Sequence, residues 1–186
     1  MPNERRMLQR IEKLTEIGIA LSAERDTERL LEMILLGAKA LTNADGGTLY
    51  SVQEDDTVKM EIMHTDSLDF AMGGTTGKPI PFKPIPLYDA QGRPNHHMVV
   101  TNAVLNDCTV NIPDAYHAEG FDFSGTKNFD DSTGYRSTSF LTVQMKDHEG
   151  SIIGVLQLLN AQDEETGNII PFGETAQRLT ESLTSQ

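Results

Sequence analysis

Two strand-like runs near the C-terminal end constrain the fold most. Residues 137–146 and 151–160 are rich in apolar and β-branched side chains, and only Asp147-His148-Glu149-Gly150 separates them. A connection this short joins antiparallel neighbours, because a parallel pair needs a crossover of about a dozen residues or more. The sequence therefore predicts an antiparallel hairpin whose apolar face must be covered by other elements.

Helical periodicity at both ends of the chain supplies that cover. Within residues 4–23, apolar side chains recur at spacings of four and three, which is typical of an amphipathic helix. Asp26 is a candidate N-cap for a second helix over residues 27–43, and residues 171–183 predict a closing helix. The stripe of the first helix consists of Met7, Ile11, Leu14 and Leu21.

The middle of the chain alternates short strands with turns and loops. Residues 48–52 and 58–64 predict a hairpin after a turn at Asp45-Gly46-Gly47. We further expect an edge strand around residues 81–88, a short helix at 97–105, a strand at 108–112 and a polar loop at 117–134. Together these elements predict an α+β fold.

The length of 186 residues favours one globular core. We expect residues 1–24 to form a signalling or dimerisation helix and residues 25–186 to form the globular domain. The four-three spacing still runs at Leu183, near the C-terminal residue. This predicts that the natural helix continues into an output domain covalently linked to this one.

The charge balance excludes some partners. With 15 basic and 28 acidic residues, the net charge is -13, which repels nucleic acid and anionic membrane surfaces. The sequence contains neither an apolar run long enough to span a membrane nor a signal peptide. We therefore expect a cytoplasmic protein with no nucleic-acid or membrane partner.

Catalytic and metal-binding motifs are missing from the sequence. Cys108 is the single cysteine, and the adjacent His96 and His97 point in different directions on a helix. The segment Gly73-Gly74-Thr75-Thr76-Gly77-Lys78 lacks the spacing of a phosphate-binding loop, so a flexible surface loop is predicted there. We expect no enzymatic activity, no metal and no cofactor.

Three segments together resemble a known family. They are Asn-Ile-Pro-Asp-Ala-Tyr at 111–116, Asp-Asp-Ser-Thr-Gly-Tyr-Arg-Ser at 130–137 and Ile-Ile-Gly-Val-Leu-Gln-Leu-Leu-Asn at 152–160. In this order they resemble the GAF domains of cyclic-nucleotide phosphodiesterases and of bacterial signalling proteins with HD-type phosphohydrolase or cyclase domains. The resemblance spans residues 26–183. It implies an antiparallel sheet of about six strands flanked by helices, with the N- and C-terminal helices packed together.

The resemblance also implies a ligand site. Positions matching Asp130, Thr133, Ser137 and Gln157 contact the nucleotide in family members that bind cyclic nucleotides, although those members carry threonine and glutamate in place of Ser137 and Gln157. The strand pattern independently places Gln157 in an apolar row with Val155 and Leu159. A buried amide needs a partner, which either a ligand or a neighbouring backbone group supplies. The candidate ligand-binding residues are Asp130, Asp131, Thr133, Ser137 and Gln157, with Tyr116, Phe121 and Phe129 as walls.

Two functions fit these observations. The first is a regulatory sensor that binds a cyclic nucleotide or another small ligand and relays its presence to the output domain through flanking helices. The alternative is a dimerisation and relay module whose pocket is vestigial and ligand-free. The helical seam at both ends of the chain is the feature that distinguishes this alternative, and it predicts a homodimer through the terminal helices. A sulfoxide reductase on the same fold needs several cysteines, which Cys108 alone does not provide.

Overall fold

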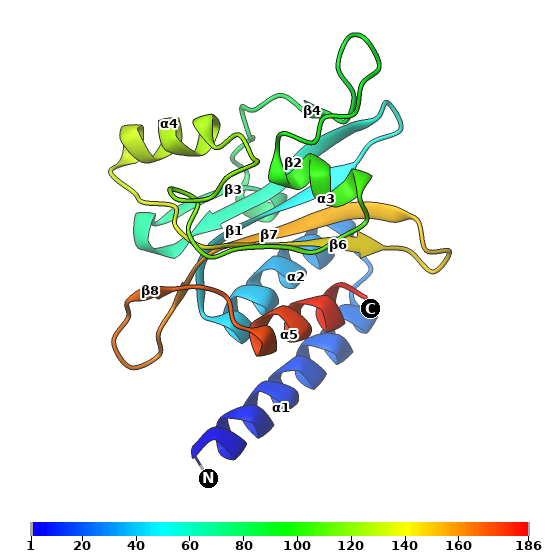
Figure 1. Cartoon of the computed structure of the whole chain (residues 1–186). Coiled ribbons are helices and arrows are strands. Elements are labelled where there is room, and N and C mark those ends of the chain that lie inside the picture. Colours follow the sequence, from blue (N-terminus) through cyan, green and yellow to red (C-terminus); the bar gives the residue numbers. More distant parts are fainter. Residues whose placement is uncertain (1, 186) are drawn as a thin grey trace.

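An antiparallel sheet runs through the middle of the molecule in the computed structural model, which describes residues 2–185 (Figure 1). Its strands follow the order β3-β2-β1-β7-β6-β5, with β4 paired to β2 and β8 paired to β7. The eight strands are β1 (Ala44–Val52), β2 (Thr57–Thr65), β3 (Phe70–Gly73), β4 (Ile85–Pro86), β5 (Val110–Ile112), β6 (Phe140–Lys146), β7 (Ile152–Gln162) and β8 (Ile169–Ile170).

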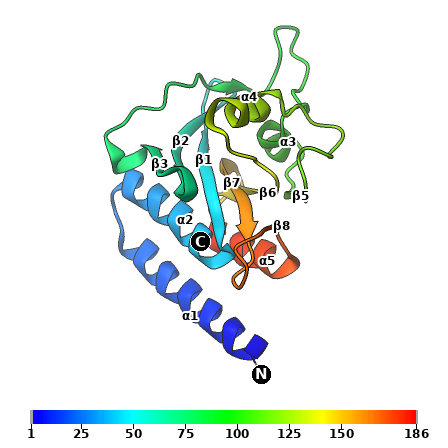
Figure 2. The ribbon, with the colours of Figure 1, turned by 90° about the vertical axis from the view of Figure 1, so that its left-hand side faces the viewer.

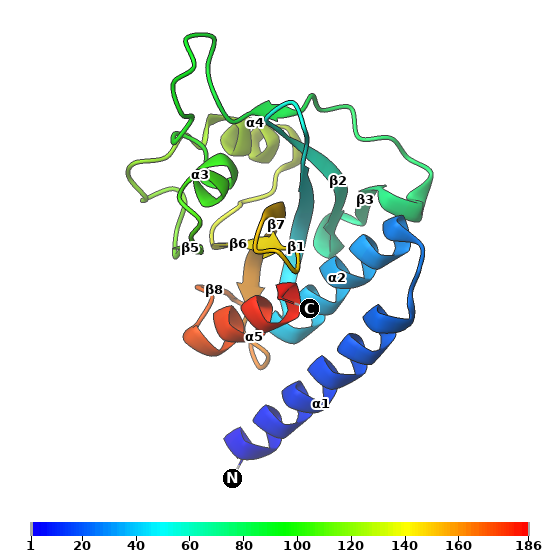
Figure 3. The same cartoon turned by 90° about the vertical axis from the view of Figure 1, so that its right-hand side faces the viewer.

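The helices cover the two faces of this sheet. On one face lie α2 (Thr27–Thr42) and α5 (Glu174–Thr184), with α1 (Pro2–Ala23) outside them. On the other face lie α3 (Val99–Leu105) and α4 (Ser124–Thr133), as Figures 2 and 3 show from two sides. Two 3-10 turns, η1 (Asp66–Leu68) and η2 (Gly74–Thr76), follow β2 and β3. The predicted α+β fold is confirmed, with eight strands in place of about six.

The core under α2 follows from the periodicity of the sequence. The Asp26 side chain caps α2 by accepting a hydrogen bond from the Arg29 N–H, as predicted, and Asn43 ends the helix at φ 54°. The apolar face of α2 packs against alternate residues of the central strands. The fully buried residues of this core include Leu35 on α2 and the strand residues Leu49, Leu141, Leu156 and Leu158.

The first helix, α1, forms an outer layer. It packs mainly against α2 and also touches α5, through the half-buried side chains of Leu14, Ile17 and Leu21. Its exposed apolar side chains are those of Met7, Leu8, Ile11 and Ile19. None of its residues is fully buried. Within residues 2–185, no helix combines the length and the apolar character needed to cross a membrane.

The turn predicted at Asp45-Gly46-Gly47 is wrong, because all three residues belong to β1. The two glycines permit close packing. A Cβ at Gly46 would lie 2.9 Å from the carbonyl oxygen of His64, and one at Gly47 would lie 2.7 Å from Cδ1 of Leu35. Glycine inside a strand often marks such a close approach. The pair Gly46-Gly47 therefore indicates close packing within β1, not a turn.

The polar loop predicted over residues 117–134 is also wrong in its second half, which forms α4. Gly134 ends this helix in the left-handed conformation at φ 74°, and its N–H donates to the Asp130 carbonyl. The prediction failed because α4 is mostly polar and has a single buried residue, Asp130. A helix with so little apolar surface leaves almost no periodic signal.

Candidate functional site

A cavity of about 490 Å³ lies between the sheet and the pair α3–α4. Its floor comes from β1, β2, β6 and β7, and its walls come from the two helices and from the extended segment that precedes β4. Small-molecule sites typically have volumes of about 300–1,000 Å³. The cavity is therefore large enough for a compact ligand.

A polar row crosses the otherwise apolar floor. Thr48, Gln157 and Thr142 stand opposite one another on the adjacent strands β1, β7 and β6. The Gln157 Nε2 atom donates to the Thr142 hydroxyl at 3.1 Å, so a neighbouring side chain supplies one partner of the amide. Thr48 and Gln157 both line the cavity, whereas Thr142 is fully buried. The floor thus presents the hydroxyl of Thr48 and the remaining hydrogen-bonding capacity of the Gln157 amide to a ligand.

Aromatic rings form much of the wall. Phe123 lies 5.9 Å from Phe140, measured between ring centroids, and Phe129 makes an edge-on contact with Phe70 at 6.2 Å. Phe121 packs edge-on against Phe123 at 6.3 Å and does not itself line the cavity. Such paired rings hold each other in place, so the wall is preorganised.

Asp130 fixes the segment beside the cavity without lining it. Its side chain is buried, and its carboxylate accepts hydrogen bonds from the Ser137 N–H at 2.8 Å, the Ser137 hydroxyl at 2.7 Å and the Tyr116 hydroxyl. The Asp130 carboxylate raises the pKa of Tyr116, because the phenol proton is its hydrogen-bond donor. Asp130 therefore joins α4 to the chain that enters β6.

Asn160, near the end of β7, holds the same segment from the other side. Its Oδ1 atom accepts from the backbone N–H groups of Thr138 and Ser139, at 2.7 and 3.1 Å. Its Nδ2 atom donates to the Arg136 carbonyl at 2.8 Å. The backbone on both sides of Ser137 is thus tied down, which presents Ser137 to the cavity in a defined position.

The structure brings three of the eight candidate residues to the cavity, namely Phe129, Ser137 and Gln157. The other five lie elsewhere. Asp130 lies behind Ser137 and Phe121 behind Phe123. Asp131 and Thr133 are exposed on α4, where the Thr133 hydroxyl donates to the Phe129 carbonyl at 2.8 Å. The ring of Tyr116 packs under the Arg136 guanidinium, 4.0 Å from the ring centroid.

Several lining residues escaped the sequence reasoning. Thr48, Tyr50, Met60, Met63 and Met98 line the cavity from β1, β2 and the start of α3. They lie far along the sequence from Gln157, and only the strand register brings them to the same face. Alternation within β1 places Thr48 and Tyr50 on one side of the sheet. Met60 and Met63 both face that side because the β1–β2 register shifts between Leu49 and Tyr50.

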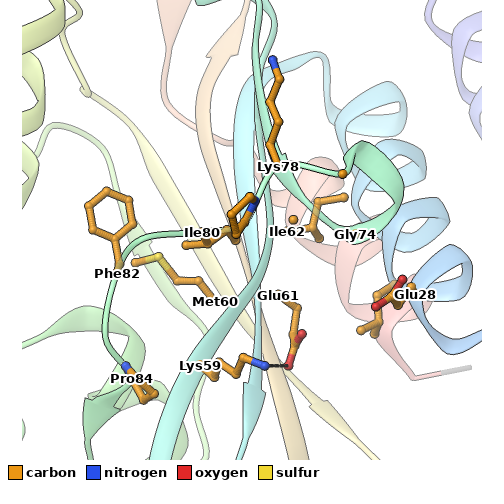
Figure 4. A pocket seen from close by; sticks show the side chains of 14 residues that line it. Glu28, Lys59, Met60, Glu61, Ile62, Gly74, Lys78, Ile80, Phe82 and Pro84 are labelled. Atoms are coloured by element: carbon orange, nitrogen blue, oxygen red, sulfur yellow. Dashed lines mark ion pairs between the residues drawn. The ribbon is translucent and has the colours of Figure 1, made fainter.

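A second cavity, of about 460 Å³, lies at the outer edge of β2 beside η2 (Figure 4). It shares Met60 and Phe82 with the first cavity. The Lys59 ammonium pairs with the Glu61 carboxylate at 3.8 Å, and in Figure 4 the Lys78 side chain points away from the other labelled side chains. Part of the segment predicted as a flexible loop is the 3-10 turn η2. Its lining also includes Glu28, and it lies at the edge of the sheet, not between the sheet and the helices, so this groove is the weaker candidate site.

No family model matches the chain. It is 28% identical over 167 residues to the dual 3′,5′-cyclic-AMP and -GMP phosphodiesterase 11 of Drosophila melanogaster. This match covers 88% of the chain but 11% of that much longer protein.

Solved structures share the fold. The GAF domain of a phosphoenolpyruvate-protein phosphotransferase from Coxiella burnetii matches with a TM-score of 0.67 and 13% identity, covering 95% of this chain and 89% of its own. The free methionine-R-sulfoxide reductase from Neisseria meningitidis matches with a TM-score of 0.61 and 18% identity, covering 94% and 83%. The predicted resemblance is confirmed, and the chain has the fold of a GAF domain.

Proposed function

We propose that this chain is a regulatory domain that binds a small molecule and belongs to a larger signalling protein. The observation that carries the proposal is the cavity between the sheet and α3–α4, with Thr48 and Gln157 in its floor. Aromatic walls and a few convergent polar groups are typical of small-molecule sites. Ligand binding there biases the arrangement of the elements around the sheet, and α1 and α5 pass the change to an output domain.

The similarity to a cyclic-AMP and cyclic-GMP phosphodiesterase makes cyclic nucleotides one ligand class to test. Thermal unfolding of the whole chain with nucleotides, nucleosides and uncharged metabolites tests the proposal. A ligand that binds only the folded state raises the unfolding temperature in proportion to its occupancy. Failure of every compound in the panel to raise it, at millimolar concentration, favours the vestigial-pocket alternative.

A matched pair of substitutions locates the site of any compound found this way. Gln157→Ala removes an amide from the cavity floor, and the loss of one hydrogen bond, about 0.5–1.5 kcal/mol, weakens binding several-fold. Thr133→Ala removes an exposed hydroxyl bonded to the Phe129 carbonyl outside the cavity, and affinity stays unchanged. Equal affinities for both variants and the unmodified chain would place the ligand elsewhere.

The relay alternative is favoured by a specific surface. The exposed apolar side chains of Met7, Leu8 and Ile11 lie on the half of α1 that has the fewest contacts with the core. We infer a homodimer in which α1 packs against a second copy. Light scattering should give the mass of a dimer for the unmodified chain and of a monomer for Ile11→Lys. A monomer in both cases contradicts this interface.

The domain itself is proposed to be non-catalytic, despite the reductase among its structural neighbours. Cys108, its one cysteine, is half-buried ahead of β5 and does not line the cavity. Within residues 2–185, no three acidic, histidine or cysteine side chains are grouped to hold a metal. Incubation with cyclic AMP, cyclic GMP or methionine sulfoxide should leave each compound unchanged, and turnover that a point mutation in the domain abolishes would overturn this.

A further inference from the structure

The lining of the cavity between the sheet and α3–α4 carries no formal charge. Among the described residues that surround it there is no lysine, arginine, histidine, aspartate or glutamate. Its polar groups are hydroxyls, such as that of Thr48, and the amides of Gln157 and Asn128. An ion moved from water into such a site loses hydration and gains no opposite charge, so the lining disfavours charged ligands.

The first turn of α4 is the feature that would most favour an anion. Gly125 and Thr126 lie in this turn and line the cavity, and the N-terminal N–H groups of a helix attract negative charge. Here Asp122 already supplies that charge, since its Oδ1 atom accepts from the Ser124 N–H at 2.9 Å. Hydrogen bonds from Ser124 hold the pKa of Asp122 below its ordinary value. A phosphate approaching this turn would therefore meet a carboxylate.

A second carboxylate borders the cavity behind Ser137. The Asp130 oxygens are committed to Ser137 and Tyr116, and Asp130 is only 3% exposed. The cations of the region lie outside the lining, with Arg136 and Lys127 over the Tyr116 ring at 4.0 and 5.8 Å from its centroid. No cation in the lining therefore offsets the repulsion that the net charge of -13 gives an anion.

The apolar part of the lining has a specific character. The thioethers of Met60, Met63 and Met98 and the rings of Phe123 and Phe129 surround the floor. Thioethers and aromatic edges pack favourably against flat rings. Resting on the proposed function, we propose that this cavity binds an uncharged, flat ligand whose hydrogen-bonding edge contacts Thr48 and Gln157, and that it selects against phosphate-bearing relatives of that ligand.

Matched probes that differ by a charged group test the selection. Isothermal titration of the whole chain compares adenosine with 3′,5′-cyclic AMP, guanosine with 3′,5′-cyclic GMP, and indole with indole-3-acetate. In the pair that binds, the uncharged member should bind at least about tenfold more tightly. Tighter binding of a cyclic nucleotide than of its nucleoside would overturn this inference while leaving the proposed function standing.

A charge-adding variant tests the cause. Thr126→Lys places a cation in the first turn of α4 at the cavity, and it should raise the affinity for the anionic member of each pair relative to the neutral one. Ser182→Lys, on the exposed side of α5 across the sheet, makes the same change in net charge and should leave the ratio unchanged. Equal ratios for the two variants contradict the electrostatic cause. Thermal unfolding confirms that both variants are folded.

A third result separates this inference from the function it rests on. If neither member of any pair binds the unmodified chain or Thr126→Lys at millimolar concentration, then the proposed ligand-binding function fails and the selectivity fails with it. Binding of the neutral probes that Gln157→Ala weakens, together with weaker binding of the anions, supports both.

Discussion

The two faces of the sheet are built differently, although they share the same strands. Toward α2, strand residues such as Leu49, Leu156 and Leu158 are fully buried in a continuous apolar core. Toward α3 and α4, the same strands carry Thr48 and Gln157 and border a cavity of about 490 Å³. A tightly packed face supplies stability, whereas a face with a cavity sacrifices packing. The face toward α2 is thus packed throughout, whereas the other face combines apolar clusters around Val155 and Phe140 with a cavity that is available for binding.

The largest expected loss of stability comes from truncating a leucine of β7 that faces α2, compared with one that faces the cavity. Leu156 is fully buried toward α2, so Leu156→Ala should lower the free energy of unfolding by about 2–5 kcal/mol. Leu159 lines the cavity, so Leu159→Ala removes fewer contacts and should cost about 1–2 kcal/mol. Urea unfolding of both variants measures the difference. Equal losses of unfolding free energy in the two variants would contradict the proposed difference between the two faces.

The next largest change in stability is expected at the buried ammonium group of Lys39 on α2. The Lys39 side chain is 5% exposed and pairs with the Asp66 carboxylate at 2.8 Å. Asp66→Asn leaves the ammonium without its counter-charge and should cost about 1–2 kcal/mol, whereas Lys39→Met removes the charge from the core and should change stability by less than about 1 kcal/mol. The reverse order in chemical denaturation would show that the ion pair itself stabilises this face.

Alkaline pH provides a test of the cavity face. Burial raises the pKa of Tyr50, which lines the cavity, and raises the pKa of Tyr135, where a hydrogen bond to Asp45 adds to the effect. The unfolded chain loses these protons near pH ~10 while the folded chain retains them, so stability should fall as pH rises above that value. The Tyr50→Phe variant should lose less stability between pH 9 and about 11 in thermal unfolding, and an identical loss would contradict the assignment.

The smallest effect is expected at the outer layer. Arg6 and Arg10 on α1 pair with Glu164 and Glu165 in the connection between β7 and β8, all at the surface. Exposed pairs contribute little, because water and salt screen them. Arg6→Ala should leave the unfolding midpoint unchanged within error. A clear shift would indicate that α1 is coupled to the core more tightly than its exposure suggests.

Sequence reasoning succeeds where elements bury apolar stripes. The four-three spacing of apolar residues around Leu14, Leu35 and Leu183 predicts α1, α2 and α5 respectively. The alternation around Gln157 predicts β7. It fails at α4, whose one buried residue, Asp130, gives no periodic signal. Helix prediction depends on burial, so a polar helix over a cavity is the element most easily missed.

The site is harder to predict than the fold for a related reason. Ser137 and Gln157 follow from motifs near one another in the sequence, whereas Met60 and Met98 reach the cavity only through strand pairing and the packing of α3. The family resemblance predicts Thr133 at the site and the polar stretch before Gly134 predicts Asp131 there, whereas in the structure both are exposed on α4. Without the register of the sheet, the sequence reveals one side of the cavity.

The glycine at position 47 has a mechanical consequence. Its backbone borders the cavity, while a Cβ there would lie 2.7 Å from Cδ1 of Leu35 on α2. At this point the partition between the binding face and the helical layer is a single polypeptide backbone thick, with no side chain to absorb displacement. In the proposed relay, a displacement of the cavity floor at position 47 would therefore act on Leu35 of α2 with no side chain in between.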